Sequence, residues 1–453
     1  MIMVADLLPG LKRFLRTCSE NQARRAMIIR VIVAFIMHRG RMSCLQAAGA
    51  DRSQPRHRAQ VARFLGRAYW VKTKLVETLW ELMLLACAEV GLYVLLFDAT
   101  SVSQQGKKTE NTHSTGNRKR RPRKGRRHSK YKHARKTCHT FTMGLLITPS
   151  GRRLPVCRPY RTRDYCEAKG IPHLTTAEAA AEVIRELKIP LGSRVVVLGD
   201  TAYDAKVMRK ACDERRFTWI FPCNPERVLA GPKGKRPKVR SLLKDLSLDS
   251  LQLLRLQPGQ GQYAVYRRLS PHRVGPKAKP RTYHVHQERR KVHSVGDVQL
   301  VFSTMNPHPK QTPDDFKILM TNDLRLKPRD IVELYSLRWQ IELFFKELKS
   351  TLGFHQYQFR QFERVEAWTE LALTTFLYLE WYRVQQIARR GLTDKERQWW
   401  RNQRTHGLCQ AVTQASQKAE LDYIATKLEN PRGVQILKRL IRNSYPKEYR
   451  MAA

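Results

Sequence analysis

Three acidic residues are the first candidates for catalysis: Asp98, Asp200 and Glu342. The two aspartates each follow a continuous apolar run, residues 93–97 and 195–199, of the kind found in strands buried on both faces. Because open α/β sheets bind ligands at the carboxyl ends of their strands, we expect both carboxylates to face a site there. Three converging carboxylates suit Mg2+ or Mn2+, and a pair of such ions can hold the attacking and leaving oxygens of a phosphodiester.

The helix expected over residues 328–353 adds a polar stripe to this site. At about 100° per residue, its four polar residues of interest fall within roughly a 60° arc. They are Tyr335, Arg338, Glu342 and Lys349. Glu342 suits a metal ion, while Arg338 and Lys349 suit phosphates beside it. A solvent-exposed face with charge pairs between neighbouring turns would show the same spacing, so the stripe alone does not decide between the two.

These motifs resemble those of a known family. The helix is similar to the Y-R-E-K signature of the IS4-type DDE transposases at all four positions: Tyr335, Arg338, Glu342 and Lys349. Residues 200–203 (Asp-Thr-Ala-Tyr) resemble the family's second-aspartate motif, an Asp followed by a small residue and an aromatic one, and Asp98 matches its first aspartate. The resemblance covers roughly residues 91–350.

The resemblance implies an α/β, RNase H-like catalytic domain, with a β-rich insertion between the second Asp and the Glu and helical regions at both ends of the chain. It implies that Asp98, Asp200 and Glu342 hold Mg2+ or Mn2+, as two ions, for DNA phosphodiester hydrolysis and transesterification. The other three signature residues would bind the transposon-end backbone. The partners implied are double-stranded DNA (the inverted-repeat ends and the target) and a second subunit, forming a homodimer that cuts and pastes an insertion sequence.

The charge balance points to the same class of partner. The 453 residues include 85 Lys and Arg against 39 Asp and Glu, a formal net charge of +46, which calls for nucleic acid or an anionic membrane. An apolar fraction of 42% excludes wholesale disorder. The apolar run 27–37 is far shorter than the roughly 20 residues that span a bilayer. No basic amphipathic helix favours a membrane surface. We therefore expect no membrane partner and a cytoplasmic protein, associated with the nucleoid when it acts.

A dense basic run follows the first aspartate. Twelve cations within nineteen residues repel one another and call for a polyanion. Because the run follows the strand of Asp98, we expect it to bind DNA phosphates beside the active site; a non-specific electrostatic tether is the alternative. The run consists of Arg118, Lys119, Arg120, Arg121, Arg123, Lys124, Arg126, Arg127, Lys130, Lys132, Arg135 and Lys136.

The length suggests about three domains, and the composition and hydrophobic pattern change several times along the chain. We expect a helical region at 1–90, which either binds transposon ends or caps the next domain. The rest divides into the catalytic core at 91–221, a β-rich insertion at 222–325, the second part of the core at 326–390 and a basic helical region at 391–453. Expected strands are 93–97, 140–147, 152–156, 195–199, 217–221, 263–268, 281–286, 298–304 and 317–321, and expected helices are 26–37, 71–85, 177–187, 203–212, 328–353 and 365–387.

Two other interpretations stay open on the sequence alone. His284 and His286 with Tyr335 form the pattern of enzymes that cut DNA with a His-hydrophobe-His metal site and a tyrosine nucleophile, although alternation in a strand produces this spacing by chance. A basic DNA-binding protein that descends from a transposase but is inactive would also keep these motifs. Trp339 and Trp219 are candidates for stacking on an extruded base, or for core packing.

Overall fold

The structure, a computed structural model, divides the chain into two compact units. The sheet unit comprises Trp80–Lys107 and Asn111–Phe345, and the helical unit comprises Met1–Leu79, Lys108–Glu110 and Lys346–Ala453. The residues described are 7–15, 22–38, 40–50, 57–67, 75–87, 89–106, 108–115, 136–231, 237–243, 246, 248–257, 260–269, 280–308, 312, 315–411, 428–429 and 431–435.

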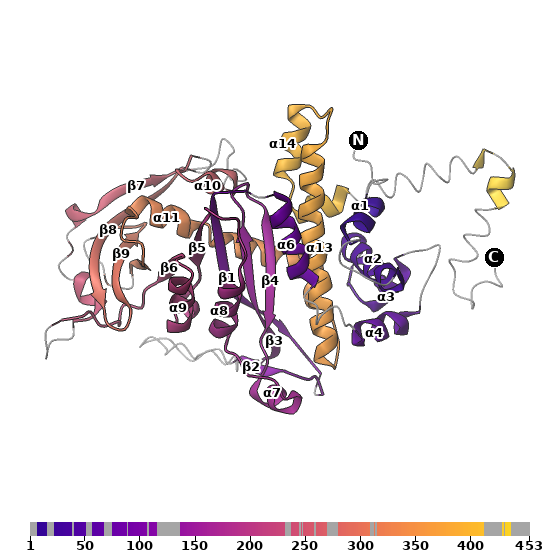
Figure 1. Ribbon diagram of the computed structural model, residues 1–453, viewed down its shortest axis with the longest axis horizontal. Coiled ribbons are helices and arrows are strands. Elements are labelled where there is room, and N and C mark those ends of the chain that lie inside the picture. Colours follow the sequence, from indigo (N-terminus) through magenta and orange to yellow (C-terminus); the bar gives the residue numbers. More distant parts are fainter. Residues whose placement is uncertain are drawn as a thin grey trace, which may run out of the picture. The chain divides into compact units, whose positions relative to one another are not determined.

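The sheet unit is built on one large mixed sheet (Figure 1). Its strands run in the order β2-β3-β1-β5-β6-β10-β9-β8-β7. β2 pairs with the first residues of β3, and β4 pairs with residues 141–147 of the same strand. β5 is parallel to β1 and β6, whereas β3 and β10 are antiparallel to their neighbours. The strands are β1 Leu92–Ser103, β2 His113–Thr115, β3 Lys136–Ile147, β4 Arg153–Pro159, β5 Arg194–Leu198, β6 Thr218–Pro222, β7 Gln252–Leu256, β8 Arg281–Val292, β9 Gly296–Thr304 and β10 Lys317–Thr321.

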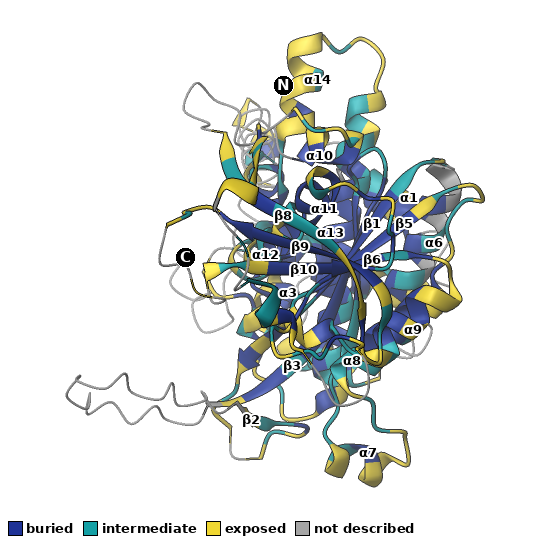
Figure 2. Ribbon diagram, turned by 90° about the vertical axis from the view of Figure 1, so that its left-hand side faces the viewer, coloured by how far each residue is buried: buried dark blue, intermediate teal, exposed yellow. Residues whose placement is uncertain are grey.

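Helices cover both sides of this sheet. In Figure 2, α10 and α11 lie on one side of it, and α8 and α9 lie on the other. α8 begins with a capping box in which Thr175 and Glu178 bond each other's backbone N–H, and it packs against α9, β3 and β4. The helices are α7 Arg163–Lys169, α8 Thr176–Glu186, α9 Lys206–Glu214, α10 Ala264–Leu269, α11 Pro328–Ser336 and α12 Trp339–Lys346, with short turns at Thr201–Tyr203, Val239–Leu243 and Leu248–Ser250.

The helical unit is organised around α13, a helix of 27 residues that is apolar on most sides and therefore buried. It contacts α1, α2, α4 and α14. Among the described residues, no helix is both long enough and apolar enough to cross a membrane. The elements are α1 Leu7–Phe14, α2 Gln22–Met37, α3 Cys44–Gly49, α4 Arg58–Gly66, α13 Phe362–Ala388 and α14 Asp394–Asn402, a π-helical turn at Glu347–Thr351 and a 3-10 turn at Phe354–Gln356; α6 Leu75–Cys87 crosses the boundary between the units.

The α/β class and most expected elements are confirmed, although β1 and β8 each extend six residues beyond their expected ends, and two other expectations are wrong. The single helix expected over 328–353 is interrupted at residues 337–338, where α11 ends and α12 begins. The strand expected at 263–268 is instead helix α10. Its start is fixed by the buried carboxylate of Glu333, which accepts the backbone N–H groups of Gln262 and Tyr263. That contact joins distant parts of the chain, so local sequence gives no sign of it.

Candidate active site

Asp98 lies inside strand β1, not at its end as the sequence suggested. β1 continues to Ser103 because β3 pairs with it as far as Cys138. On the other side, the parallel strand β5 ends at Leu198, opposite Leu96. Asp98 is therefore two residues past the last β1–β5 pair, where the sheet opens on that side.

Asp200 occupies the matching position beyond β5. It lies two residues past Leu198, so the register places it next to Asp98, and the two-residue period of the strands points both side chains to the same face. Asp200 caps the turn Thr201–Tyr203, and its Oδ1 accepts the backbone N–H of Ala202 at 2.9 Å. This bond restricts the direction in which the carboxylate points.

Arg338 joins two of the three acids. Its Nη1 lies 3.4 Å from Oδ2 of Asp98, and its Nη2 pairs with Oε1 of Glu342, which lies one turn further along in α12. The three side chains are 19%, 19% and 31% exposed, so the contacts are only partly open to solvent. The interruption between α11 and α12 does not separate these residues, and the structure brings the predicted acid and arginine together.

The carboxylates also interact with one another. Burial is the main cause that raises the pKa of Asp98, and the negative charges of Asp200 and Glu342 raise it further. The N–H of Ala99, 2.7 Å from Oδ1, and the charge of Arg338 lower it, without reversing the shift. The three acids therefore form one electrostatically coupled group.

Tyr335 and a lysine absent from the sequence-based prediction complete this group. Tyr335 is buried, its hydroxyl donates to the carbonyl of Gly199 at 3.4 Å, and burial raises its pKa to about 12. Nζ of Lys317, the first residue of β10, lies 4.5 Å from the centre of the Tyr335 ring. Desolvation and the charge of Arg338 lower the pKa of Lys317. Lys317 could be found only from the strand order, which brings β10 next to β6.

The remaining signature residue, Lys349, belongs to the helical unit, in the turn Glu347–Thr351. Burial lowers the pKa of its amine. The basic run from Arg118 to Arg135 lies outside the described residues, and of its members only the backbone of Lys136, at the start of β3, is described. In the chain, the run follows β2 and leads into β3.

The other aromatic and histidine candidates are placed as follows. Trp219 is 2% exposed and stacks on Phe221 in the core, whereas Trp339 is 47% exposed. His286 bonds Oε1 of Glu288 at 3.1 Å. Within the described part of the chain, no three His, Cys, Asp or Glu side chains are arranged to hold a metal ion.

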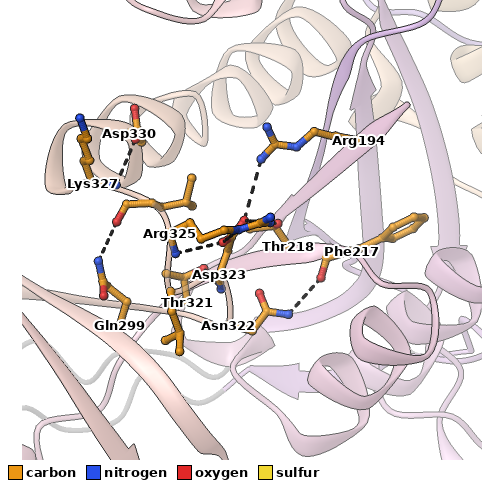
Figure 3. A network of polar contacts seen from close by, with 12 residues as sticks. Arg194, Phe217, Thr218, Gln299, Thr321, Asn322, Asp323, Arg325, Lys327 and Asp330 are labelled. Atoms are coloured by element: carbon orange, nitrogen blue, oxygen red, sulfur yellow. Dashed lines mark hydrogen bonds and ion pairs between the residues drawn. The ribbon is translucent and has the colours of Figure 1, made fainter. Parts of the chain in front are cut away.

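The helix that carries Tyr335 is anchored at the opposite end of the sheet (Figure 3). Asp323, in the turn between β10 and α11, accepts bonds from Arg325 at 3.0 Å and from Thr218 at 3.5 Å, and it lies 3.9 Å from Arg194. Thr218 and Arg194 begin β6 and β5, so these contacts tie the start of α11 to the ends of the strands remote from Asp200. α11 then crosses the sheet toward the acids.

The chemistry of the donor set fits a hard divalent cation, because all three predicted ligands are carboxylates. In this structure the guanidinium of Arg338 lies between Asp98 and Glu342, and the three acids do not form a closed metal cluster. A bound ion would compete with Arg338 for these oxygens. The electrostatic coupling of the acids shows why the site favours a positive charge.

A family comparison agrees with this geometry. A model described as a transposase DDE domain matches residues 90–378, a range that covers more than half of the chain and includes all three acids. A comparison with curated proteins finds no match. Proteins with this domain generally use divalent metal ions. With a domain match of this extent, the chain belongs to the family of transposases with a DDE domain.

Proposed function

We propose that this protein is the transposase of an IS4-type insertion sequence, which binds the transposon ends and carries out cleavage and strand transfer with Asp98, Asp200 and Glu342. One observation carries the proposal: an acid in β1, one just past β5 and one in α12 interact at one end of the sheet, two of them through Arg338. Coupled carboxylates in a protein of net charge +46 suit metal-dependent chemistry on a polyanion.

The topology supports an RNase H-like catalytic core. The strand order is β4-β3-β1-β5-β6, with β3 antiparallel to β1 and with β5 and β6 parallel to it; Asp98 lies in β1 and Asp200 just past the end of the neighbouring β5. The β-rich insertion of residues 222–325 would then continue the same sheet from β6 through β10 to β7. We propose that the core comprises 91–221 and 326–390, of which residues 346–390 belong to the helical unit.

Each residue has a distinct role in this proposal. The three carboxylates would hold Mg2+ or Mn2+, two ions in all, which when bound supply an activated oxygen nucleophile next to the DNA phosphate. Arg338, Tyr335 and Lys349 would each bind the backbone of the transposon end, Arg338 through a phosphate oxygen. The exposed ring of Trp339 suits stacking on a DNA base, whereas the buried Trp219 does not.

The end-binding region proposed at 1–90 contains a suitable helix, α4. Val61 and Leu65 are buried on one face of α4, whereas Gln60, Arg63 and Arg67, the residue that ends the helix, are exposed. A short helix with a buried apolar face and an exposed basic one has the form of a helix that enters the DNA major groove. We propose that α4 contacts the transposon end there, that the run 118–136 binds flanking phosphates, and that two subunits pair on two ends.

Exchange of both Arg63 and Arg67 for Gln is expected to weaken end binding and reduce its dependence on salt. Two lost phosphate contacts lower the slope of log K against log salt by about 1.8. The measurement is fluorescence anisotropy with a labelled transposon end at several salt concentrations. The exposed pair Arg389 and Arg390, changed to Gln, serves as the control. An unchanged slope in the α4 variant would remove this helix from the DNA interface.

The proposed function is tested with a supercoiled plasmid that carries the element's own ends. Wild-type protein with Mg2+ or Mn2+ is expected to excise the marked segment, and no product is expected with EDTA or with scrambled ends. The variant Glu342→Gln, which keeps the side-chain shape but loses the charge, should bind ends without cutting. Glu167→Gln, an exposed glutamate of α7, should cut normally.

The inactive alternative makes a different prediction in the same assay. A DNA-binding relic would bind the ends with wild-type and Glu342→Gln proteins alike, and neither would cut with any divalent ion. That result would overturn the enzymatic proposal. Cutting by the Glu342→Gln variant at the wild-type rate would instead exclude Glu342 from the reaction.

A further inference from the structure

A buried charge cluster lies directly behind the second aspartate. The side chain of Asp204, the residue after the turn Thr201–Tyr203, is only 3% exposed. Two arginines from other elements converge on it: Arg209 from α9, 8% exposed, and Arg227 from the segment after β6, 21% exposed.

The contacts of Asp204 use both of its carboxylate oxygens and its backbone. Arg209 pairs with Oδ1. Arg227 pairs with Oδ2 through two nitrogens, with its Nε at 2.9 Å, and a further bond of 3.2 Å joins it to the carbonyl oxygen of Asp204. Three elements of the sheet unit are thus joined at one residue. A buried cluster with two cations and one anion is poor evidence for stability, because desolvation offsets much of the attraction. Its evident effect is to fix the geometry of the turn.

The turn held in this way is the one that presents Asp200. Asp200 caps the turn by accepting the backbone N–H of Ala202, and at the other end the N–H of Asp204 donates to the carbonyl of Thr201 at 3.4 Å. Tyr203 is 1% exposed and packs on Phe97 in the core. A displacement of Asp204 would therefore be transmitted to Asp200 through only three intervening residues.

The start of the turn leaves equally little freedom. A Cβ on Gly199 would lie 2.7 Å from Cβ of Tyr203, so only glycine fits, and the Gly199 carbonyl accepts the hydroxyl of Tyr335. We infer that Asp204, held by Arg209 and Arg227, is a positioning residue that sets the direction of the Asp200 carboxylate toward a divalent ion. This inference rests on the proposed role of Asp200 as a metal ligand.

The test measures metal binding directly, with Mn2+ alone as the probe. Binding of Mn2+ to the full chain is followed by electron paramagnetic resonance for wild type, Asp204→Asn and Arg227→Lys. Residues that orient metal ligands change affinity by about 10–100-fold, and we expect a loss of that size in Asp204→Asn. Arg227→Lys keeps the charge but loses the two-nitrogen contact, so a smaller loss is expected. Cleavage by both variants should recover at high Mn2+.

Controls separate positioning from folding. Arg240→Lys changes an arginine that pairs with the exposed Glu226 in the same segment, and its Mn2+ affinity should equal that of wild type. Thermal unfolding and end binding show whether Asp204→Asn folds. If it does not, the Mn2+ affinity of Arg227→Lys decides whether the cluster positions Asp200. If the folded variants bind Mn2+ with wild-type affinity, the positioning role of Asp204 is overturned and the proposed function is not affected. A wild-type protein that binds no Mn2+ would overturn the proposed function, and the inference with it.

Discussion

Asp98→Asn is expected to slow DNA cleavage about 10²–10³-fold, the usual cost of removing one electrostatic group that acts on the reacting centre. The same change is expected to raise the unfolding temperature of the metal-free protein at pH 7. Both effects concern the same carboxylate, whose ionised form is disfavoured in the metal-free protein by burial first and then by the charges of Asp200 and Glu342. Groups that an active site needs for its reaction commonly lower the stability of the folded protein.

The sign of the stability effect follows from the pKa of Asp98. In the unfolded chain an aspartate has a pKa of about 3.9. In the folded protein burial first, and then the neighbouring carboxylates, raise this pKa. The folded state therefore keeps its proton to a higher pH than the unfolded state. The contribution of Asp98 to stability is complete below about pH 3.9 and is lost as the pH rises through the folded-state pKa. At pH 7 the ionised side chain is a net cost, which asparagine removes.

The measurement is thermal unfolding of wild type and Asp98→Asn, without metal, between pH 4 and pH 8, together with the plasmid assay. The gain in unfolding temperature should be largest at neutral pH and shrink toward pH 4. Asp297→Asn, an exposed residue of β9, should show neither effect. An Asp98→Asn protein that is less stable than wild type at pH 7 would mean that the bond to Arg338 outweighs the repulsion.

The sequence predicted a strand before each aspartate, but not the full extent of the elements that carry the three acids. Apolar runs located the cores of β1 and β5, because a strand buried on both faces needs apolar side chains throughout. The runs did not show where β1 ends, since its last residues are set by pairing with β3 on one edge only. The interruption at residues 337–338 was missed for a similar reason: the apolar spacing continues through it.

The rest of the candidate site depends on contacts between distant segments. Lys317 is close to Tyr335 because β10 joins the sheet beside β6, and no local pattern reveals strand order. Asp323 and Asp204 look like ordinary loop aspartates in the sequence. In the structure both aspartate side chains are buried, and Arg194 and Arg227 reach them from segments distant in the sequence.

Glu333→Ala is expected to have the largest effect on stability. This carboxylate in α11 is fully buried and accepts the backbone N–H groups of Gln262 at 3.1 Å and Tyr263 at 2.8 Å. Alanine leaves both of these part-buried donors without their partner, at a cost of up to about 1–3 kcal/mol each. Glu333→Gln retains one carbonyl oxygen as an acceptor and should fall between alanine and wild type. Urea unfolding of the three proteins measures the free energies.

Gly261→Ala tests the same junction without touching the charge. A Cβ there would lie 2.2 Å from the Tyr266 ring and 2.5 Å from Oε1 of Glu333, an overpacking that costs about 1–3 kcal/mol. Gly49→Ala, where a Cβ meets nothing within 4 Å, is the matched control and should not destabilise. If Glu333→Ala and Gly261→Ala unfold at the wild-type urea concentration, the 261–263 segment does not hold α11. The helix that carries Tyr335 would then depend on the Asp323 anchor alone.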